Sequence, residues 1–264
     1  MKRASLPLDW SSHIIIWAAS TKGATNQEQS CRRAKLPSDL ESRKAIAIDG
    51  PAASGKTAVG TELARRLDYR FLDTGGMYRA ITLLALEAGI DLQDQAALTE
   101  LAQHTRMELV GGPSGDRMVV DGRDVTGELR ARKVDSSVSR VSAVRGVRIA
   151  LVQQQREVAE QGPIVMVGRD IATVVLPDAK VKVYLNASVE VRTRRRVREM
   201  NACGRDASYE RVLEELRMRD SIDIERFESP LRPAEEALIV DTDDMSVDEI
   251  ADNVLQHFRP EKWS

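Results

Sequence analysis

The sequence has few cysteines and few histidines, and both shortages exclude classes of protein. Cys31 and Cys203 are the only cysteines in 264 residues, and their separation fits neither a disulfide framework nor a CxxC metal motif. His13, His104 and His257 show no metal-ligand spacing. The chemistry must therefore come from other side chains, and we expect a reducing, cytoplasmic location.

An excess of charge of one sign is also missing. Lys and Arg number 39 against 41 Asp and Glu, and aromatic residues make up 4%. Proteins that bind single-stranded nucleic acids combine a basic groove with aromatic platforms, so we expect no nucleic-acid partner. No run approaches the roughly 18 apolar residues of a membrane span, and the apolar patch at 14–19 is short for a signal peptide. We therefore expect no membrane partner.

What the sequence does contain is an alternation of strand and helix patterns. Residues 1–43 are polar without a sustained period, and we interpret them as a disordered extension. Apolar runs then lie at 45–48, 70–72, 164–167, 181–185 and 237–240, with helical patterns at 57–67, 77–88, 189–200 and 247–258. The pattern predicts an α/β domain over 44–258, with a five-stranded parallel sheet covered by helices on both faces, and a tail at 259–264.

Two segments interrupt this alternation. Strand-like runs at 106–110 and 118–120 flank a Gly-rich turn, which predicts a small antiparallel insertion within about 100–145. A second insertion is expected at about 192–208, where arginines surround a short turn. Such a segment either closes over phosphates or is a basic, solvated helix.

A phosphate-binding loop directly follows the first predicted strand. Gly50-Pro51-Ala52-Ala53-Ser54-Gly55-Lys56-Thr57 matches GxxxxGK[ST] between a strand and a helix. In this motif the backbone N–H groups face a phosphate, the lysine reaches the β- and γ-phosphates, and the hydroxyl can hold Mg²⁺. The loop and the following Ala58 therefore predict ATP binding. They do not identify the acceptor, because GTPases, motor ATPases and metabolite kinases share the motif.

Three more clusters place arginines where a ligand can bind. Arg79 lies in the first turns of a helix that opens after a polar turn, and Arg169 follows a strand. The segment 219–226 runs on a predicted helix, with positions 219, 223 and 226 on one face. Each cluster alone is also typical of a solvated surface. Together they favour an acceptor that itself carries a phosphate.

In their order and spacing these segments resemble the bacterial cytidylate kinase family. The resemblance runs from about 44 to 258, and its motifs are the P-loop, 72–79, Gly168-Arg169-Asp170 with 173–179, and 219–231. It implies the nucleoside monophosphate kinase fold, with an acceptor-binding insertion and an Arg-rich lid. It also implies transfer of the γ-phosphoryl group of ATP to CMP or dCMP, in pyrimidine nucleotide metabolism.

The resemblance implies roles for the matching positions. The residues expected at the acceptor are Thr74, Arg79, Arg169 and Arg219 for the phosphate, Asp223 and Arg226 for the ribose, and Ser139, Arg148 and Asp170 for the cytosine. The expected catalytic residues are Lys56, Arg169 and the lid arginines Arg192, Arg195 and Arg196. Because a carboxylate can accept from the cytosine amino group and an arginine can reach N3 and O2, Asp170 and Arg148 are predicted to select C over U.

The chain departs from the family pattern at three positions. Thr74 replaces a common Ser, Ala172 a usual Gly, and Val167 a common acidic residue. The last departure removes a carboxylate that would support Mg²⁺ through water. We pair Thr57, the expected Mg²⁺ ligand, with Asp49 acting through water, while Asp73 and Asp170 remain open.

Two alternative functions also remain open. One is another small-acceptor P-loop kinase, acting on UMP, AMP, dTMP or shikimate, and the other is a regulatory P-loop NTPase. A phosphate monoester is largely a dianion at neutral pH and needs no general base, whereas an alcohol acceptor would profit from a nearby Asp. We expect a monomer whose partners are small molecules.

Overall fold

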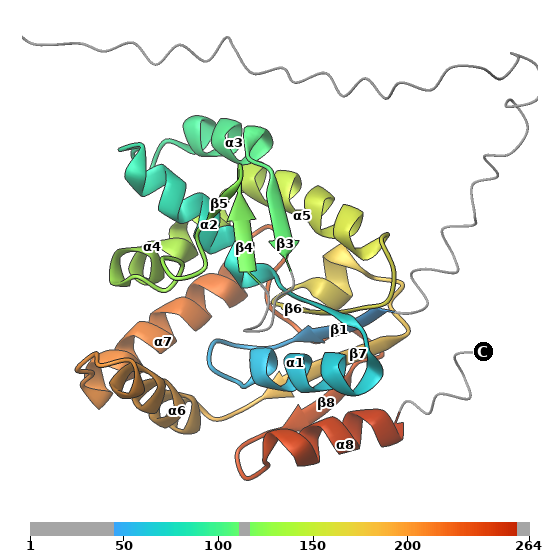
Figure 1. The fold of residues 1–264 in the computed structure, drawn as a ribbon. Coiled ribbons are helices and arrows are strands. Elements are labelled where there is room, and N and C mark those ends of the chain that lie inside the picture. The colour runs from blue at the N-terminus through green and yellow to red at the C-terminus, as the bar shows by residue number, and fades with distance from the viewer. Residues whose placement is uncertain (1–44, 111–116, 258–264) are drawn as a thin grey trace, which may run out of the picture. The chain divides into compact units, whose positions relative to one another are not determined.

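Five parallel strands form the central sheet in the part of the chain that the structure, a computed structural model, describes: residues 45–110 and 117–257 (Figure 1). In spatial order they are β2 (Arg70–Asp73), β6 (Ile164–Gly168), β1 (Ala45–Asp49), β7 (Val181–Asn186) and β8 (Leu238–Asp241). The predicted fold class is confirmed. The extension at 1–43 and the tail at 259–264 lie outside the described residues, so the domain limits stay predictions.

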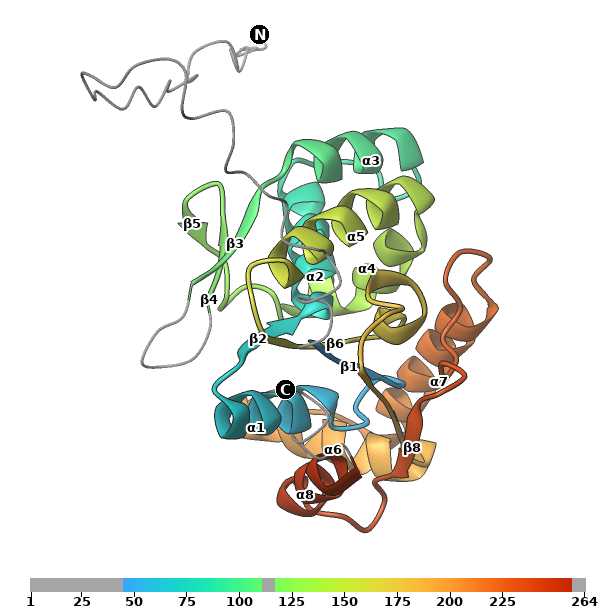
Figure 2. The ribbon, with the colours of Figure 1, turned by 90° about the vertical axis from the view of Figure 1, so that its right-hand side faces the viewer.

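The central strand β1 shows why both faces of the sheet are covered. Successive side chains of a strand point to opposite faces, and in β1 Ala45 and Ala47 belong to one buried cluster while Ile46 and Ile48 belong to another. Two helices cover each face (Figures 1 and 2): α1 (Lys56–Leu67) and α8 (Val247–His257) the isoleucine face, and α2 (Thr74–Glu87) and α5 (Arg145–Ala159) the alanine face. Within the described ranges, none of the helices combines the length and apolar character that a bilayer crossing requires.

A separate antiparallel sheet confirms the predicted insertion. Its strands are β3 (Met107–Val110), β4 (Arg117–Val120) and the short, unpredicted β5 (Arg123–Asp124), and its helices are α3 (Gln95–His104) and α4 (Arg132–Ala143). Met118 and Val120 of β4 join the same buried cluster as α2 and α4. The insertion therefore shares its core with the alanine face of the main sheet.

Two helices pack beside the P-loop: α6 (Val189–Ala202), which carries most of the predicted lid arginines, and α7 (Tyr209–Glu225). Ala52 of the loop forms a small apolar cluster with Val212 and Leu216 of α7. Because α7 ends at Glu225, Arg226 is its C-cap residue and does not lie within the helix.

Local interactions determine the conformation of the loops at the carboxyl edge of the sheet. Gly50 has φ 151°, and a Cβ there would lie 2.2 Å from the Leu185 carbonyl oxygen, so this turn excludes other residues. Helix α2 begins at Thr74, earlier than the predicted 77, because the Asp73 carboxylate caps it by accepting from the Gly75 N–H at 3.0 Å. After β6, residues 171–175 form a π-type turn, a feature frequent at functional sites.

Candidate functional site

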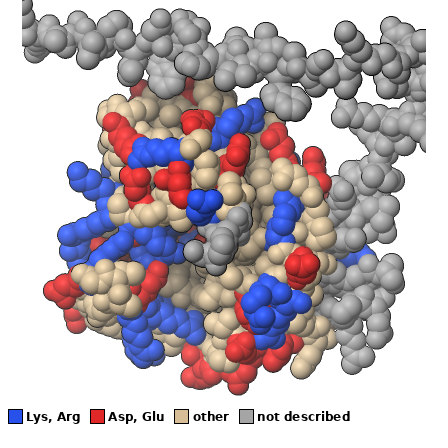
Figure 3. Space-filling model, in the orientation of Figure 1, with Lys and Arg blue, Asp and Glu red and all other residues tan. Residues whose placement is uncertain are grey.

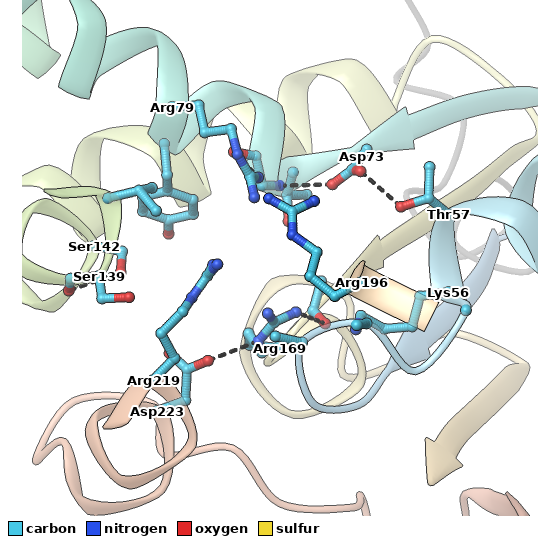
Figure 4. A pocket seen from close by; sticks show the side chains of 18 of the residues that line it. Lys56, Thr57, Asp73, Arg79, Ser139, Ser142, Arg169, Arg196, Arg219 and Asp223 are labelled. Atoms are coloured by element: carbon cyan, nitrogen blue, oxygen red, sulfur yellow. Dashed lines mark hydrogen bonds and ion pairs between the residues drawn. The ribbon is translucent and has the colours of Figure 1, made fainter. Parts of the chain in front are cut away.

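A cavity of about 640 Å³ lies at the carboxyl edge of the sheet (Figure 4). From the predicted donor side it is lined by Ala52, Ala53, Gly55, Lys56, Thr57 and Ala58. From the predicted acceptor side and the lid it is lined by Thr74, Arg79, Ser139, Arg148, Arg169, Asp170, Arg195, Arg196, Arg219, Asp223 and Arg226. Gly50, Pro51, Ser54 and Arg192 do not line it. One cavity therefore brings together most of the predicted site.

The cavity is strongly basic although the chain has a net charge of −2. Eight arginines and Lys56 line it, against five carboxylates. Lys and Arg side chains also gather over α4, α6 and α7 on the surface in Figure 3. Arginines that converge from several elements suit a ligand set with more than one phosphate group.

Lys56 begins α1 and lies within the P-loop. Its Nζ donates to the Pro51 carbonyl at 2.6 Å and contacts Ser54 Oγ at 3.3 Å. Burial, together with nearby Arg169, lowers the pKa of Lys56 well below its usual value. A phosphate beside the amine would favour the charged form again, because an anion stabilises an ammonium group.

Thr57 and Asp73 form an oxygen-rich corner beside the P-loop. The Thr57 hydroxyl donates to Asp73 Oδ2 at 2.9 Å, and both residues line the cavity (Figure 4). Asp170, by contrast, pairs with Arg148. The geometry therefore favours Asp73 as the carboxylate beside Thr57, a choice that the sequence left open.

Asp49, the carboxylate that the sequence paired with Thr57, does not line the cavity. Its two oxygens accept the backbone N–H groups of Ile171 and Ala172, both at 2.8 Å. Burial raises the pKa of Asp49 to about 6, against the opposing effect of these two hydrogen bonds. Asp49 therefore connects the end of β1 to the turn that follows Arg169.

Val167, the departure from the family pattern, is an apolar core residue here. It belongs to the buried cluster of the isoleucine face. It packs so closely against α1 that a Cβ at Gly60 would lie 2.6 Å from Val167 Cγ1 and 2.8 Å from the ring of Phe71. The position thus contributes packing and no charge.

Arg169 and Asp223 form an ion pair at the centre of the cavity, with Arg169 Nε donating to Asp223 Oδ2 at 2.8 Å (Figure 4). Burial opposes ionisation of Asp223, but Arg169, Arg226 and Arg219 together hold its pKa below the usual value. Burial and the neighbouring Arg79 and Arg169 lower the pKa of Arg219 to about 10. The buried Nε of Arg219 has no hydrogen-bond partner among the described residues, so this N–H group is available to donate.

Arg148 and Asp170 form a second ion pair, buried deeper in the cavity. Arg148 donates to Asp170 and to the Ser142 carbonyl, the latter at 3.2 Å, and its guanidinium lies 5.5 Å from the ring centroid of Tyr78. Asp170 Oδ1 lies 3.8 Å from Arg226 NH2. Ser139 lies on the same wall of the cavity as Ser142 (Figure 4). The wall therefore offers both donors and acceptors to a flat polar group.

The three predicted lid arginines separate into different environments. Arg192 is buried behind the P-loop, where NH1 donates to the Ala52 carbonyl at 3.3 Å and to Asp220 at 2.7 Å. Arg195 donates to Thr242 at the edge of the cavity. Arg196 extends into the cavity toward Arg79 (Figure 4).

Some charged residues at the cavity were not found from the sequence. Arg130 and Glu199 line it, and Asp135 contacts Arg79 and Arg196 from α4. They come from separate elements and match no motif, so no spacing in the sequence could have indicated them.

The comparison with known proteins agrees with this geometry. A family model described as cytidylate kinase matches residues 46–260. The chain belongs to the cytidylate kinase family. A cytidylate kinase of Bacillus velezensis is 47% identical over 217 residues, which are 82% of this chain and 97% of the relative. One of Mycobacterium avium is 50% identical over 210 residues, 79% and 92% of the two chains.

The likeness to a solved shikimate kinase structure is weak. A shikimate kinase from Acinetobacter baumannii in complex with shikimate covers 85% of this chain and 98% of its own, at 18% identity and a TM-score of 0.43. This likeness is too low to bear on the acceptor.

The substitution Asp49→Asn should destabilise the fold by about 1–3 kcal/mol, because an amide nitrogen would face one of the two buried N–H groups. The measurement is urea unfolding, with Asp121→Asn in an exposed turn as the matched control. A loss no larger than that of the control would contradict the connecting role of Asp49.

Proposed function

We propose that the protein transfers the γ-phosphoryl group of ATP to CMP or dCMP, giving CDP or dCDP and ADP. One observation carries this proposal: the P-loop and the Gly168-Arg169-Asp170 block open into the same basic cavity, in a chain of the cytidylate kinase family. ATP binds on the P-loop side, and the acceptor binds between α2, α4, α5 and α7.

The acceptor phosphate binds among Arg79, Arg169 and Arg219. The three side chains converge from α2, the loop after β6, and α7 (Figure 4). Thr74 lines the same wall, where its hydroxyl donates to the Val167 carbonyl at 3.0 Å, so its oxygen is left to accept. A dianionic phosphate beside Arg219 stabilises the charged guanidinium and raises its lowered pKa toward the usual value. This charge interaction favours binding of the acceptor.

The nucleoside end of the acceptor lies at the second ion pair. Asp170 accepts from the cytosine amino group, while Arg148 and Ser139 donate to its acceptor atoms. The Nε of Arg148 is buried without a hydrogen-bond partner among the described residues, which supports a ligand contact there. The ribose contacts Asp223 and Arg226. Uracil presents an acceptor in place of the amino group, so Asp170 disfavours it.

Phosphoryl transfer requires no general base in this site. The acceptor phosphate is a dianion at neutral pH and is itself the nucleophile. The residues of the cavity place the two phosphates in line and neutralise charge, with Lys56 on the donor side, Arg169 between the substrates and Arg196 from the lid. Arg192 acts from behind the P-loop, where it supports the Ala52 carbonyl, and Arg195 lies at the cavity edge.

Mg²⁺ is expected with ATP, and the residues fit it. The Thr57 hydroxyl and the Asp73 carboxylate are adjacent oxygen groups on the cavity wall. Mg²⁺ commonly takes one or two protein oxygens and completes its shell with phosphates and water. When bound, it neutralises charge on the β- and γ-phosphates. We also propose that the enzyme is a cytoplasmic monomer, which size-exclusion chromatography with light scattering tests for the oligomeric state.

The acceptor preference can be tested in a coupled assay of ADP release. With ATP and Mg²⁺, CMP and dCMP should be phosphorylated at least about 100-fold more efficiently than UMP, AMP, dTMP or shikimate, because the buried polar wall rejects bases that leave it unpaired. Preference for another acceptor would overturn the proposal. Hydrolysis without any acceptor, together with single-stranded RNA retained on filters, would indicate a regulatory NTPase.

Substitution of the central cations should remove activity. Arg169→Ala and Lys56→Met are each expected to lower kcat by about 10³-fold, because each removes a positive side chain that stabilises the negative charge of the transferred phosphoryl group. Arg211→Ala, which removes an exposed arginine of α7, is the control. Circular dichroism checks folding, and full activity in either folded site variant would contradict the assignment.

The fall of activity at low pH should reflect the second pKa of the acceptor phosphate. Protonation of the CMP phosphate below its second pKa, near 6, removes one negative charge, so kcat/KM for CMP should fall as pH drops through about 6. Cytidine 5′-phosphorothioate has a lower second pKa, and with it the fall should move to lower pH. If kcat/KM falls at the same pH with both acceptors, the titrating group belongs to the protein and the prediction is wrong.

A further inference from the structure

Asp135 lies on α4, in the insertion, and belongs to no motif of the sequence. Its side chain is 14% exposed. Asp135 Oδ2 accepts from Arg196 NH2 at 2.7 Å, and Oδ1 accepts from Arg79 Nε at 3.4 Å. Arg205, in the turn after α6, lies 3.7 Å from Oδ2. One carboxylate thus contacts an arginine of the acceptor wall and two arginines of the lid segment.

A second contact runs beside the first. Glu199 of α6 accepts from Arg196 NH1 at 2.9 Å with one oxygen and from Arg130 NH1 at 2.6 Å with the other. Arg130 lies just before α4, the helix that carries Asp135. The side chains therefore alternate in charge in the order Arg130, Glu199, Arg196, Asp135 and Arg79, and they link α6 to the insertion and to α2.

This arrangement fixes where Arg196 points. Long arginine side chains lose considerable rotamer freedom when they are held in one place. Both terminal nitrogens of Arg196 are held by carboxylates, one on its own helix and one on α4. Its guanidinium is thereby directed toward Arg79 (Figure 4). Two guanidinium groups side by side repel each other, and a shared carboxylate offsets that repulsion.

We propose that Asp135 is a positioning residue for phosphoryl transfer. It holds Arg196 of α6 beside Arg79 of α2. One negative charge thereby aligns an arginine that faces the donor with an arginine that faces the acceptor. The inference rests on the proposed function and deepens it. Asp135 acts through Arg196 and Arg79 and does not itself contact the reacting atoms.

The contact can be measured without any catalytic assay. The full chain carrying Cys31→Ser and Arg140→Cys is spin-labelled at Cys203, which is exposed after α6, and at the new thiol, at an exposed position on α4. Asp135→Asn should broaden the distance distribution and lengthen its mean. Salt at 1 M should do the same to the parent, because it screens partly exposed ion pairs. Asp252→Asn, at an exposed ion pair between α8 and α1, is the matched control and should change nothing.

The kinetic test separates positioning from general stability. Asp135→Asn should lower kcat with CMP by about tenfold while the KM for ATP changes by less than about twofold, because misaligned groups lose transition-state interactions first. In an Arg196→Ala background the same substitution should lower kcat by less than about twofold, because the arginine that Asp135 positions is absent. Asp135→Glu, which keeps the charge, should retain more activity than Asp135→Asn.

The outcomes distinguish this inference from the function itself. Absence of CMP phosphorylation in the parent protein would overturn the proposed function, and the labelled distances would still test the Asp135 contact. An unchanged distance in Asp135→Asn would overturn the inference, as would equal losses from that substitution with and without Arg196. If Asp135→Asn fails to fold, equal kcat values for Asp135→Glu and the parent, with the parent distance kept, support the role of the charge.

Discussion

Arginine side chains can share one cavity only when carboxylates lie between them, and this balance of charge is the constraint on which the rest of the site depends. Three aspartates each contact at least two arginines within 4 Å: Asp170 contacts Arg148 and Arg226, Asp223 contacts Arg169 and Arg226, and Asp135 contacts Arg79, Arg196 and Arg205. Buried charges are costly unless paired, so these bridges allow the basic wall to fold. Positive charge remains in excess, and together with burial it lowers the pKa of Arg219 to about 10.

Features that depend on neighbours in sequence could be predicted from it. The strands of the main sheet have short, buried, apolar segments, and β1 alternates small and large residues because each face packs against different helices. The P-loop was predicted as well, because its glycines and Lys56 occupy fixed positions between a strand and a helix. Even the small antiparallel sheet followed from two apolar runs flanking a turn.

Features that depend on contacts between distant elements could not be predicted in the same way. The sequence paired Asp49 with Thr57 and left Asp73 and Asp170 open, and only the fold shows that two backbone N–H groups already occupy Asp49. Arg192 and Arg196 lie on the same face of α6, one turn apart, yet Arg192 meets the P-loop and Asp220 while Arg196 meets Asp135 of α4 at the cavity. Asp135 has no sequence signal, because its partners are 56 and 61 residues away.

The two hydrogen bonds of Asp49 have a consequence for how such an enzyme can change over time. They tie the start of the P-loop to the turn that directly follows Arg169, so these two parts of the site are held together. Two of the three residues proposed at the base, Ser139 of α4 and Arg148 of α5, lie on helices outside this connection, whereas Asp170 lies next to it. In evolutionary terms, side chains of α4 and α5 can change without disturbing the connection between the P-loop and the turn after Arg169.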